Sequence, residues 1–329
     1  LEQYGAERWT PLDGISAHPK VDERSGEMLF FNYSTYPPYQ HYGVVDSNNK
    51  LVHYTPVPTP GPRLPHDMAF TENYSILVDL PMFWNPTLLE QGKYHAEYHP
   101  ELPTRFAILP RYGTAEDAIW FEASPTYVLH WMNAYEDGDE IILDGYFQDD
   151  PDPAPLPGLP PAAGKMMANI DLCSLKTRLH RWRFNLKTGE VKEQHLDERA
   201  LEFGTFNQRY AGIKSRYLYS VWNEPGMFLF SGMVKHDLET GDSWELPFGE
   251  QRYGSEAPFA PRVNAKDEDD GYLVSFITDM KADRSECVLI DAKDIEAGPV
   301  CRIILPHRIS SGTHATWADG QSIRAYQNP

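Results

Sequence analysis

The chain has 329 residues, and its 29 basic against 48 acidic side chains give a formal net charge of −19. This length is enough for one large domain or two ordinary ones with a sizeable core. A surface this negative disfavours nucleic acid and anionic membrane surfaces as partners, because both present phosphate groups.

Cysteine usage and hydropathy exclude further classes. Cys173, Cys287 and Cys301 form no CxxC pair, which excludes a disulfide scaffold and a zinc ribbon and fits a reducing, cytoplasmic location. No run approaches 18 apolar residues, so no membrane insertion is expected.

A hairpin signature recurs along the chain. In each instance Asp or Asn opens a short turn and glycine closes it, at a position where positive φ is needed, over Val21–Glu27, Asn185–Glu190 and His236–Asp242. Short runs with β-branched and aromatic residues predict strands at Met28–Tyr33, Ser75–Pro81, Tyr127–Ala134, Glu140–Phe147, Arg216–Trp222, Tyr272–Thr278 and Cys287–Asp291. Many short strands with almost no amphipathic helical pattern predict an all-β sandwich, barrel or propeller, and the repeated hairpin favours the propeller.

Two segments break this pattern. Met82–Arg105 is irregular and rich in Trp, Tyr, His and Pro. Asp149–Pro161 carries six prolines, which exclude a central strand and predict a stiff, Pro-rich insertion over residues 149–165. Long loops on a rigid scaffold often form the entrances for substrates.

Four histidines begin or end predicted apolar strands, namely His18, His66, His130 and His314. A single histidine in this setting is typical of a satisfied core residue. In a propeller, however, the inner strand of each blade lines one central channel, so four such imidazoles would meet there. Imidazole suits Fe, Cu, Ni and Zn.

Other polar residues are expected to be solvated. Glu136 lies beside Asp137 and Asp139 and is predicted to sit at a hairpin tip. The remaining histidines lie in polar or irregular contexts and are likewise predicted to be solvated: His41, His53, His95, His99, His180, His195, His236 and His307.

Five ordered motifs resemble those of a known family. They are AHPKVDERSGEM, HDMAFTENY, HWMNAYEDGDE, SEAPFAPR followed by DEDDGYLVSF, and GTHATW. In this order they resemble the carotenoid cleavage oxygenases, and most closely the lignostilbene dioxygenase branch. The resemblance implies a single seven-bladed β-propeller domain over residues 1–329, with a loop and helical cap over one face. It also implies a non-haem Fe(II) ion held by His18, His66, His130 and His314.

The resemblance further implies glutamates that accept a hydrogen bond from the outer nitrogen of a ligand imidazole. Two are expected here, Glu202 and Glu256, and such a partner fixes the ring and raises its basicity. Ala315 follows His314 where the family usually has Gly. Only 17 residues precede His18, so the N-terminal part of the propeller, with the residues that bind a phenol, is expected to be missing from this sequence.

The predicted function is that of an Fe(II)-dependent dioxygenase. It would cleave a conjugated C=C bond of a phenolic stilbene or phenylpropenoid with O₂ to give two aldehydes, and a homodimer is possible. The alternatives are an apocarotenoid-cleaving oxygenase, a hydrolytic propeller using Ca²⁺ or Zn²⁺, and a propeller binding module without chemistry. The hydrolytic class would want Asp, Glu and Asn ligands, whereas iron content would separate the binding module from the enzyme.

Overall fold

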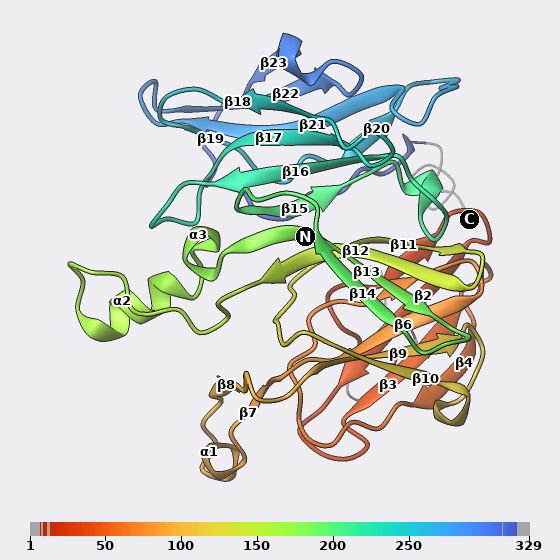
Figure 1. Cartoon of the computed structure of the whole chain (residues 1–329). Helices are drawn as coiled ribbons and strands as arrows, with labels where there is room; N and C mark the ends of the chain where they lie inside the picture. The colour runs from red at the N-terminus through yellow and green to blue at the C-terminus, as the bar shows by residue number, and fades with distance from the viewer. Residues whose placement is uncertain (1–6, 8, 12–13, 311, 321–329) are drawn as a thin grey trace. The chain divides into compact units, whose positions relative to one another are not determined.

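The computed structural model describes residues 7, 9–11, 14–310 and 312–320. The chain divides into two compact units, of which unit 1 contains residues 1–152, 179–197 and 211–214 and unit 2 contains the rest. Nearly all of the regular structure is antiparallel sheet (Figure 1). Among the described residues, no helix has both the length and the apolar character needed to cross a membrane.

Unit 1 is built from three four-stranded sheets. In spatial order the first consists of β1 (Lys20–Asp22), β2 (Glu27–Tyr33), β3 (Gln40–Val45) and β4 (Leu51–Pro56). The second consists of β10 (Ile119–Ala123), β9 (Thr104–Pro110), β6 (Tyr74–Asp79) and β5 (Ala69–Phe70). The third consists of β11 (Trp131–Asp137), β12 (Glu140–Gln148), β13 (Thr177–Asn185) and β14 (Val191–His195). In each sheet the strand that comes first in the chain is an edge strand.

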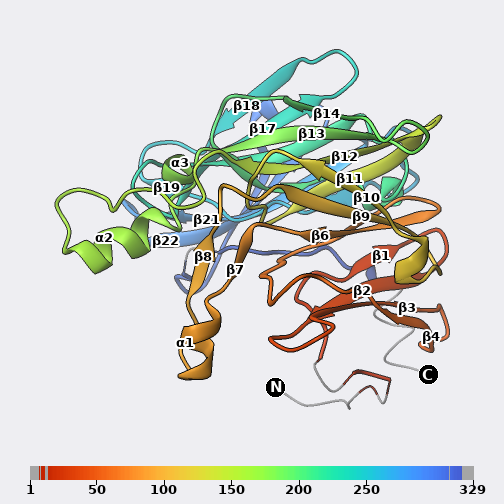
Figure 2. The same cartoon turned by 60° about the horizontal axis from the view of Figure 1, so that its bottom comes forward.

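A separate hairpin leaves the second sheet of unit 1. The chain exits after β6, forms the two-stranded sheet of β7 (Met82–Trp84) and β8 (Ala96–Tyr98) around helix α1 (Pro86–Glu90), and returns at β9. Two views show β7, β8 and α1 projecting away from β6 and β9 (Figures 1 and 2). A short 3₁₀ helix, Ala115–Asp117, follows β9.

Unit 2 contains two sheets and most of the helical structure. One sheet consists of β15 (Leu201–Thr205), β16 (Tyr217–Asn223), β17 (Phe230–Asp237) and β18 (Ser243–Pro247). The other consists of β19 (Arg252–Tyr253), β21 (Gly271–Asp279), β22 (Arg284–Asp291) and β23 (Pro299–Ile304), with β20 (Phe259–Pro261) paired to β21. The helices are α2 (Pro161–Ala168), α3 (Leu172–Leu175) and the 3₁₀ helices Gln208–Tyr210 and Ile295–Ala297.

The recurrent turns form hairpins of one type. In the first, the backbone nitrogen of Gly26 donates to the carbonyl of Asp22 at 2.8 Å, and in the second Gly189 donates to Asn185 at 2.9 Å. Both glycines have positive φ, +73° at Gly26 and +76° at Gly189, which other residues adopt only at a cost. The hairpin prediction from the sequence is therefore confirmed, including the one between β17 and β18.

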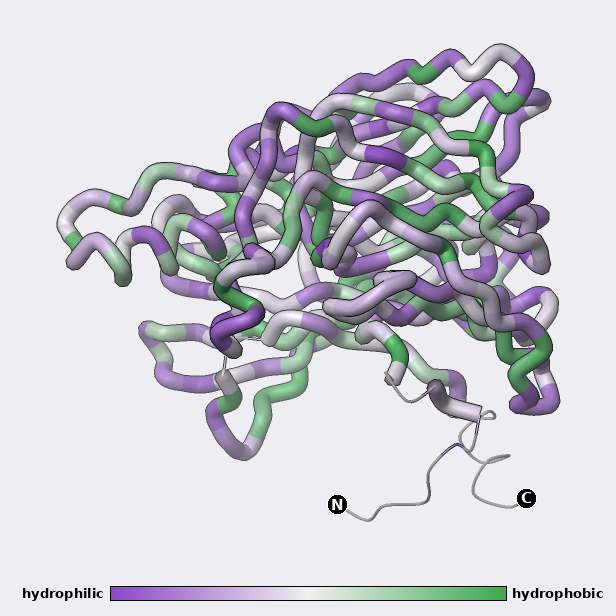
Figure 3. Tube along the Cα trace, turned by 90° about the horizontal axis from the view of Figure 1, so that it is seen from below, coloured by the Kyte–Doolittle hydropathy of each residue, from purple (hydrophilic) through white to green (hydrophobic). Residues whose placement is uncertain are grey.

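Each unit has its own hydrophobic core, and apolar and polar residues are interleaved along the trace (Figure 3). In unit 1 the rings of Phe106, Trp182 and Phe184 are fully buried and pack together, with Phe106 and Phe184 centroids 4.8 Å apart. In unit 2, Leu273 of β21 and Ile290 of β22 are fully buried and face each other across the ladder. Side chains alternate between the two faces along each strand, and those on the inward face supply both cores.

One strand prediction is wrong in its boundary. The run Tyr127–Ala134 was expected to be a single strand, but β11 begins only at Trp131. Val128 is fully buried in the core of unit 1 without belonging to a ladder. A buried irregular segment and a buried strand share the same continuous apolar pattern, so periodicity does not separate them.

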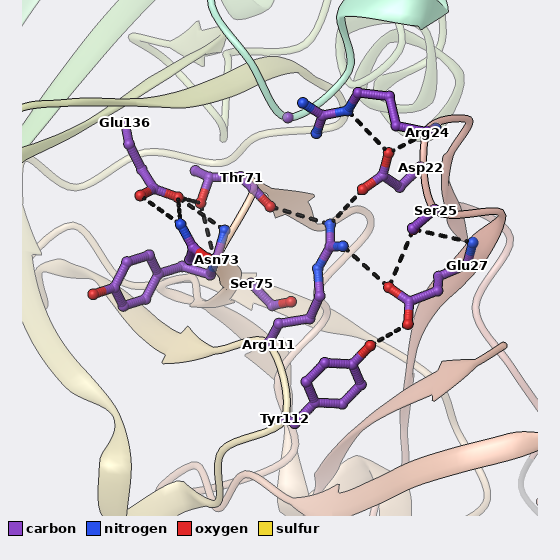
Figure 4. A network of polar contacts seen from close by, with 12 residues as sticks. Asp22, Arg24, Ser25, Glu27, Thr71, Asn73, Ser75, Arg111, Tyr112 and Glu136 are labelled. Carbon is purple, nitrogen blue, oxygen red and sulfur yellow. Dashed lines mark hydrogen bonds and ion pairs between the residues drawn. The ribbon is translucent and has the colours of Figure 1, made fainter.

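A polar network joins the three sheets of unit 1 (Figure 4). Arg111, which follows β9, donates to Asp22 at the end of β1 at 2.9 Å and to the carbonyl of Thr71, just after β5, at 3.2 Å. Glu136 of β11 accepts hydrogen bonds from the Thr71 hydroxyl at 2.7 Å and from the backbone nitrogen of Asn73 at 2.9 Å. The prediction that Glu136 is a solvated tip is therefore wrong, because its carboxylate binds the turn of the neighbouring sheet.

Candidate metal centre

Three of the four predicted histidines occupy equivalent places in unit 1. His18 lies two residues before β1, His66 three residues before β5, and His130 directly before β11. Each of these strands is the edge strand that opens its sheet. The repeated architecture therefore brings residues that are far apart in sequence to one place.

The three imidazoles converge. The Nε2 atoms of His18 and His66 lie 3.0 Å apart. The ring of His130 lies 4.9 Å from that of His18 and 5.3 Å from that of His66, measured between centroids. One nitrogen from each ring can be chosen so that all three lie within 4.8 Å of one another. This spacing allows the three nitrogens to bind a common ion.

Burial favours the neutral form of His18. His130 is only 8% exposed, and burial lowers the pKa of His18 to about 3, against the opposing effect of the negative charge of Asp67. A neutral imidazole has a lone pair available for a metal, whereas an imidazolium has none. A set of neutral nitrogen donors fits a first-row transition metal such as iron and does not fit Ca²⁺ or Mg²⁺, which prefer oxygen.

A buried aspartate connects the three segments that carry these histidines. Asp67 is 2% exposed, and its carboxylate accepts from the Lys20 ammonium at 2.8 Å and from the backbone nitrogen of Trp131 at 2.9 Å. Lys20, Asp67 and Trp131 all lie within the family motifs, but the sequence alone does not indicate a role for them. The available signal was that each directly follows a predicted ligand, by one or two positions.

The fourth predicted ligand lies in unit 2. His314 follows β23, and its side chain is 47% exposed. Its Nδ1 lies 3.2 Å from Oε2 of Glu256, and the same carboxylate oxygen accepts from the backbone nitrogen of Ala315 at 2.8 Å. Glu256 therefore holds both the ring and the backbone of this loop, as expected for a glutamate that orients a ligand imidazole.

Glu202 is fully buried in β15 of the same unit. One of its carboxylate oxygens accepts from the backbone nitrogen of Phe203 at 2.6 Å. Phe203 has a positive φ of 47°, and the register of β15 against β16 shifts between Glu202 and Thr205. Such a bulge re-aims side chains and often marks a functional site. The ring of Phe203 packs 5.0 Å from that of His314.

The structure corrects the expectation that all remaining histidines are solvated. His180 of β13 is only 4% exposed, and its Nδ1 lies 3.0 Å from Nδ1 of His195 on the neighbouring strand. Burial lowers the pKa of His180 to about 3. His236 of β17 is also buried. The charged neighbours Arg181, Lys235 and Asp237 are themselves buried in ion pairs, so a polar stretch of sequence did not indicate an exposed one here.

The protein is therefore an all-β protein whose antiparallel sheets resemble propeller blades. Three histidines, each just before the first strand of a sheet, form an imidazole cluster. Residues 1–319 match the family described as "Retinal pigment epithelial membrane protein" (RPE65). The chain belongs to this family, whose carotenoid cleavage oxygenases are non-haem iron enzymes that cleave C=C bonds. The predicted resemblance is thereby confirmed.

The curated relatives act on more than one kind of alkene. Over 325 residues the chain is 35% identical to carotenoid 9,10(9',10')-cleavage dioxygenase 1 of Arabidopsis thaliana, covering 94% of this chain and 59% of the relative. It is 30% identical over 318 residues to isoeugenol monooxygenase of Pseudomonas putida, covering 92% and 65% of the two chains. The chain thus spans about three fifths of the length of these relatives.

Solved structures place the fold. The lignostilbene dioxygenase of Pseudomonas brassicacearum matches with a TM-score of 0.79 at 28% identity, covering 93% of this chain and 66% of that one. Cobalt-substituted Synechocystis ACO matches with a TM-score of 0.81 at 25% identity, covering 93% and 65%. The predicted all-β propeller architecture is confirmed by these matches. The described residues contribute five blade-like sheets, and a total of seven stays a prediction.

Proposed function

We propose that this protein is a non-haem Fe(II) dioxygenase that cleaves the conjugated C=C bond of a phenolic stilbene or phenylpropenoid with O₂. The products are two aldehydes. The observation that carries the proposal is the convergence of His18, His66 and His130, with the Nε2 atoms of the first two 3.0 Å apart. Family membership adds the class of reaction.

In this proposal the protein's residues bind and orient. His18, His66 and His130 are ligands, and His314 is the fourth. Glu256 accepts the outer proton of His314 and so fixes which nitrogen faces the metal. Glu202, fully buried, is the second glutamate to which the family resemblance assigns such a role. Four neutral imidazoles add no negative charge, and an Fe(II) ion held by them would supply the activation of O₂.

The reaction needs no external reductant. One C=C bond and one O=O bond break, and two C=O bonds form, so that each oxygen atom of O₂ ends in one product. Atoms and electrons balance without a flavin, haem or nicotinamide. The protein's part is to place the alkene and O₂ side by side and to keep them there.

A para-phenol is the substrate feature that the chemistry favours. When deprotonated, the phenol donates electron density to the alkene and makes oxygenation easier. Two relatives support this choice, because the matched enzymes include an isoeugenol monooxygenase and a lignostilbene dioxygenase. The net charge of −19 and the mean hydropathy of −0.52 suit amphipathic substrates taken from water. The free cysteines Cys173, Cys287 and Cys301 support the proposed cytoplasmic location.

An apocarotenoid is the second candidate substrate. It is favoured by the carotenoid 9,10(9',10')-cleavage dioxygenases, the first of which shares 35% identity with this chain. A carotenoid has no phenol, so its alkene must be oxygenated without that electron donation. The two candidates therefore differ in their sensitivity to methylation of the phenol.

The test compares four compounds under air with the iron-loaded protein: a 4-hydroxystilbene, its 4-O-methyl ether, isoeugenol and an apocarotenal. We expect cleavage of the hydroxystilbene to two aldehydes, each carrying one label from ¹⁸O₂, with loss of turnover on methylation. Preference for the apocarotenal, or equal turnover of the methyl ether, would overturn the phenolic assignment. His66→Ala is the metal-deficient control, and His95→Ala, whose side chain is 61% exposed, is its matched control.

The binding-module alternative makes a different prediction. A module without chemistry has no use for a metal, and its purified form would contain no stoichiometric iron. A purified protein that contains no iron and cleaves none of the four compounds would favour the binding module over the enzyme.

A further inference from the structure

We propose that Asp67 is a positioning residue, which holds the three ligand-bearing segments of unit 1 in place before any metal binds. This inference rests on the metal site of the proposed function and deepens it. It concerns how the site is built and not which alkene is cleaved.

The contacts of Asp67 span all three sheets of unit 1. Lys20, two residues after His18, places its ammonium 2.8 Å from Oδ1 and 2.9 Å from Oδ2. Trp131, directly after His130, donates its backbone nitrogen to Oδ2 at 2.9 Å and its indole nitrogen to the Asp67 carbonyl at 3.3 Å. Asp67 itself directly follows His66. One residue thus touches each segment within two positions of its ligand.

The chemistry of these partners requires an acceptor on both oxygens. Lys20 donates to the two carboxylate oxygens, Trp131 donates to Oδ2, and the backbone nitrogen of Met68 donates to Oδ1 at 2.7 Å. An ionised carboxylate accepts only, whereas an asparagine amide presents an NH₂ group in place of one oxygen. In Asp67→Asn, with almost no change in volume, the NH₂ group faces the donors that one of the carboxylate oxygens accepted from. An attraction on that oxygen's side is therefore replaced by a contact between donors.

The hydrogen bonds of Asp67 lie close enough to the histidines to affect where their imidazoles stand. The Trp131 backbone nitrogen belongs to the peptide bond that joins His130 to Trp131. A shift of its hydrogen bond to Asp67 therefore moves the His130 imidazole directly. Asp67 is 2% exposed, so water does not readily replace a lost partner. A metal site with fixed ligands binds without first having to gather them, and loose ligands lower affinity.

A matched control separates positioning from general stability. Asp144 of β12 is 1% exposed and accepts two hydrogen bonds from Arg181 of β13, at 2.7 and 2.8 Å. It belongs to the same unit and is an equally buried anion with a cationic partner, but it adjoins no predicted ligand in sequence. Asp144→Asn should cost stability in the same way as Asp67→Asn and should leave the metal site intact.

The experiment is an anaerobic titration of metal-free protein with Co(II), followed by its visible absorption bands, and with Fe(II) in competition with a chelator. It is run well below the lowest unfolding midpoint of the variants. We expect Asp67→Asn to weaken both metals by about 10–100-fold and to change the cobalt bands. Asp144→Asn should stay within about 2-fold of the wild type, given its separate ion pair.

Two outcomes overturn the inference: wild-type affinity in Asp67→Asn, or an equal loss in Asp144→Asn. If Asp67→Asn does not fold, Lys20→Met decides, because the Lys20 side chain is 24% exposed and its loss is tolerated more easily. We then expect Lys20→Met to bind both metals several-fold more weakly. Unchanged metal affinity in this variant contradicts the positioning role of Asp67. A wild-type protein that binds neither metal overturns the proposed function itself, which distinguishes the two failures.

Discussion

The carboxylate of Glu256 holds the loop of His314 by two contacts on one oxygen, the imidazole Nδ1 at 3.2 Å and the backbone nitrogen of Ala315 at 2.8 Å. The backbone nitrogen of Glu256 in turn donates to the carbonyl of Thr313 at 3.1 Å. Loop and glutamate therefore support each other from both sides. With Nδ1 held in this way, Nε2 is the atom of His314 that we propose as the metal ligand.

Glu256→Gln should weaken iron binding by about 10–100-fold, because the amide keeps the size of the side chain but loses the anionic acceptor that orients the ring. Iron affinity is measured by anaerobic competition with a chelator. Glu296→Gln, at an exposed position of the 3₁₀ helix Ile295–Ala297 in the same unit, is the matched control and should bind iron as the wild type does. Unchanged affinity in Glu256→Gln would mean that His314 needs no support from this residue.

His66→Ala and His130→Ala should each lose most of the bound iron and all turnover. Each substitution removes one of the three nitrogens that lie within 4.8 Å of one another, and so takes away one of the four proposed imidazole ligands of the ion. Iron per chain is measured after anaerobic loading and desalting. Full iron occupancy in either variant would remove that histidine from the ligand set.

Arg111→Met should destabilise the protein by on the order of 3 kcal/mol, because it leaves the buried Asp22 carboxylate without its main cationic partner. The free energy of unfolding is measured by urea titration. Arg308→Met, which breaks the exposed pair with Asp283, should cost about 0.5 kcal/mol or less. A similar small cost for both variants would show that the network of Figure 4 does not hold the sheets of unit 1 together.

His180 should make the protein less stable in acid. Its pKa falls from 6.5 to about 3 on folding because it is buried and lies against His195. Between these two values the unfolded chain binds a proton that the native chain does not, so stability is complete above 6.5 and declines as the pH falls toward 3. His18 contributes in the same direction, since burial lowers its pKa to about 3 as well.

The measurement is the free energy of unfolding at about pH 7 and about pH 4.5, compared between variants. His180→Gln is uncharged throughout and should lose less stability between these two conditions than the wild type. His95→Gln, on an exposed side chain, should follow the wild type. An equal pH dependence in all three proteins would mean that another group is responsible for the acid sensitivity.

The sequence predicted the fold through its turns. Gly26 and Gly189 fix hairpins of one type, and a turn that requires positive φ is a local property that neighbouring residues do not override. The boundary of β11 was missed for the opposite reason. Val128 is buried by its tertiary surroundings, and a buried loop carries the same apolar letters as a strand.

The sequence indicated the candidate histidines but not the residues that hold their segments in place. The histidines were visible because each one opens an apolar run, and the structure brings His18, His66 and His130 together. The contacts of Asp67 and Glu136 could not be predicted, because their partners lie 64 and 65 residues away; for Asp67 only its place directly after His66 gave a signal. Long-range polar contacts of this kind depend on the register of whole sheets.

The β7–β8 hairpin leaves the second sheet of unit 1 without disturbing it. The chain departs at Asp79 and returns at Thr104, yet Asp79 still pairs directly with Arg105 across the ladder between β6 and β9. The hairpin is nevertheless tied to the segment before His66, because Leu64 donates a backbone hydrogen bond to Met82 at 3.0 Å and Trp84 donates one to Pro62 at 3.1 Å. A graft of this hairpin between relatives therefore has to keep the pairing of β7 with residues 62–64, whereas helix α1, which has no buried residue, can be exchanged without refolding the sheet next to His66.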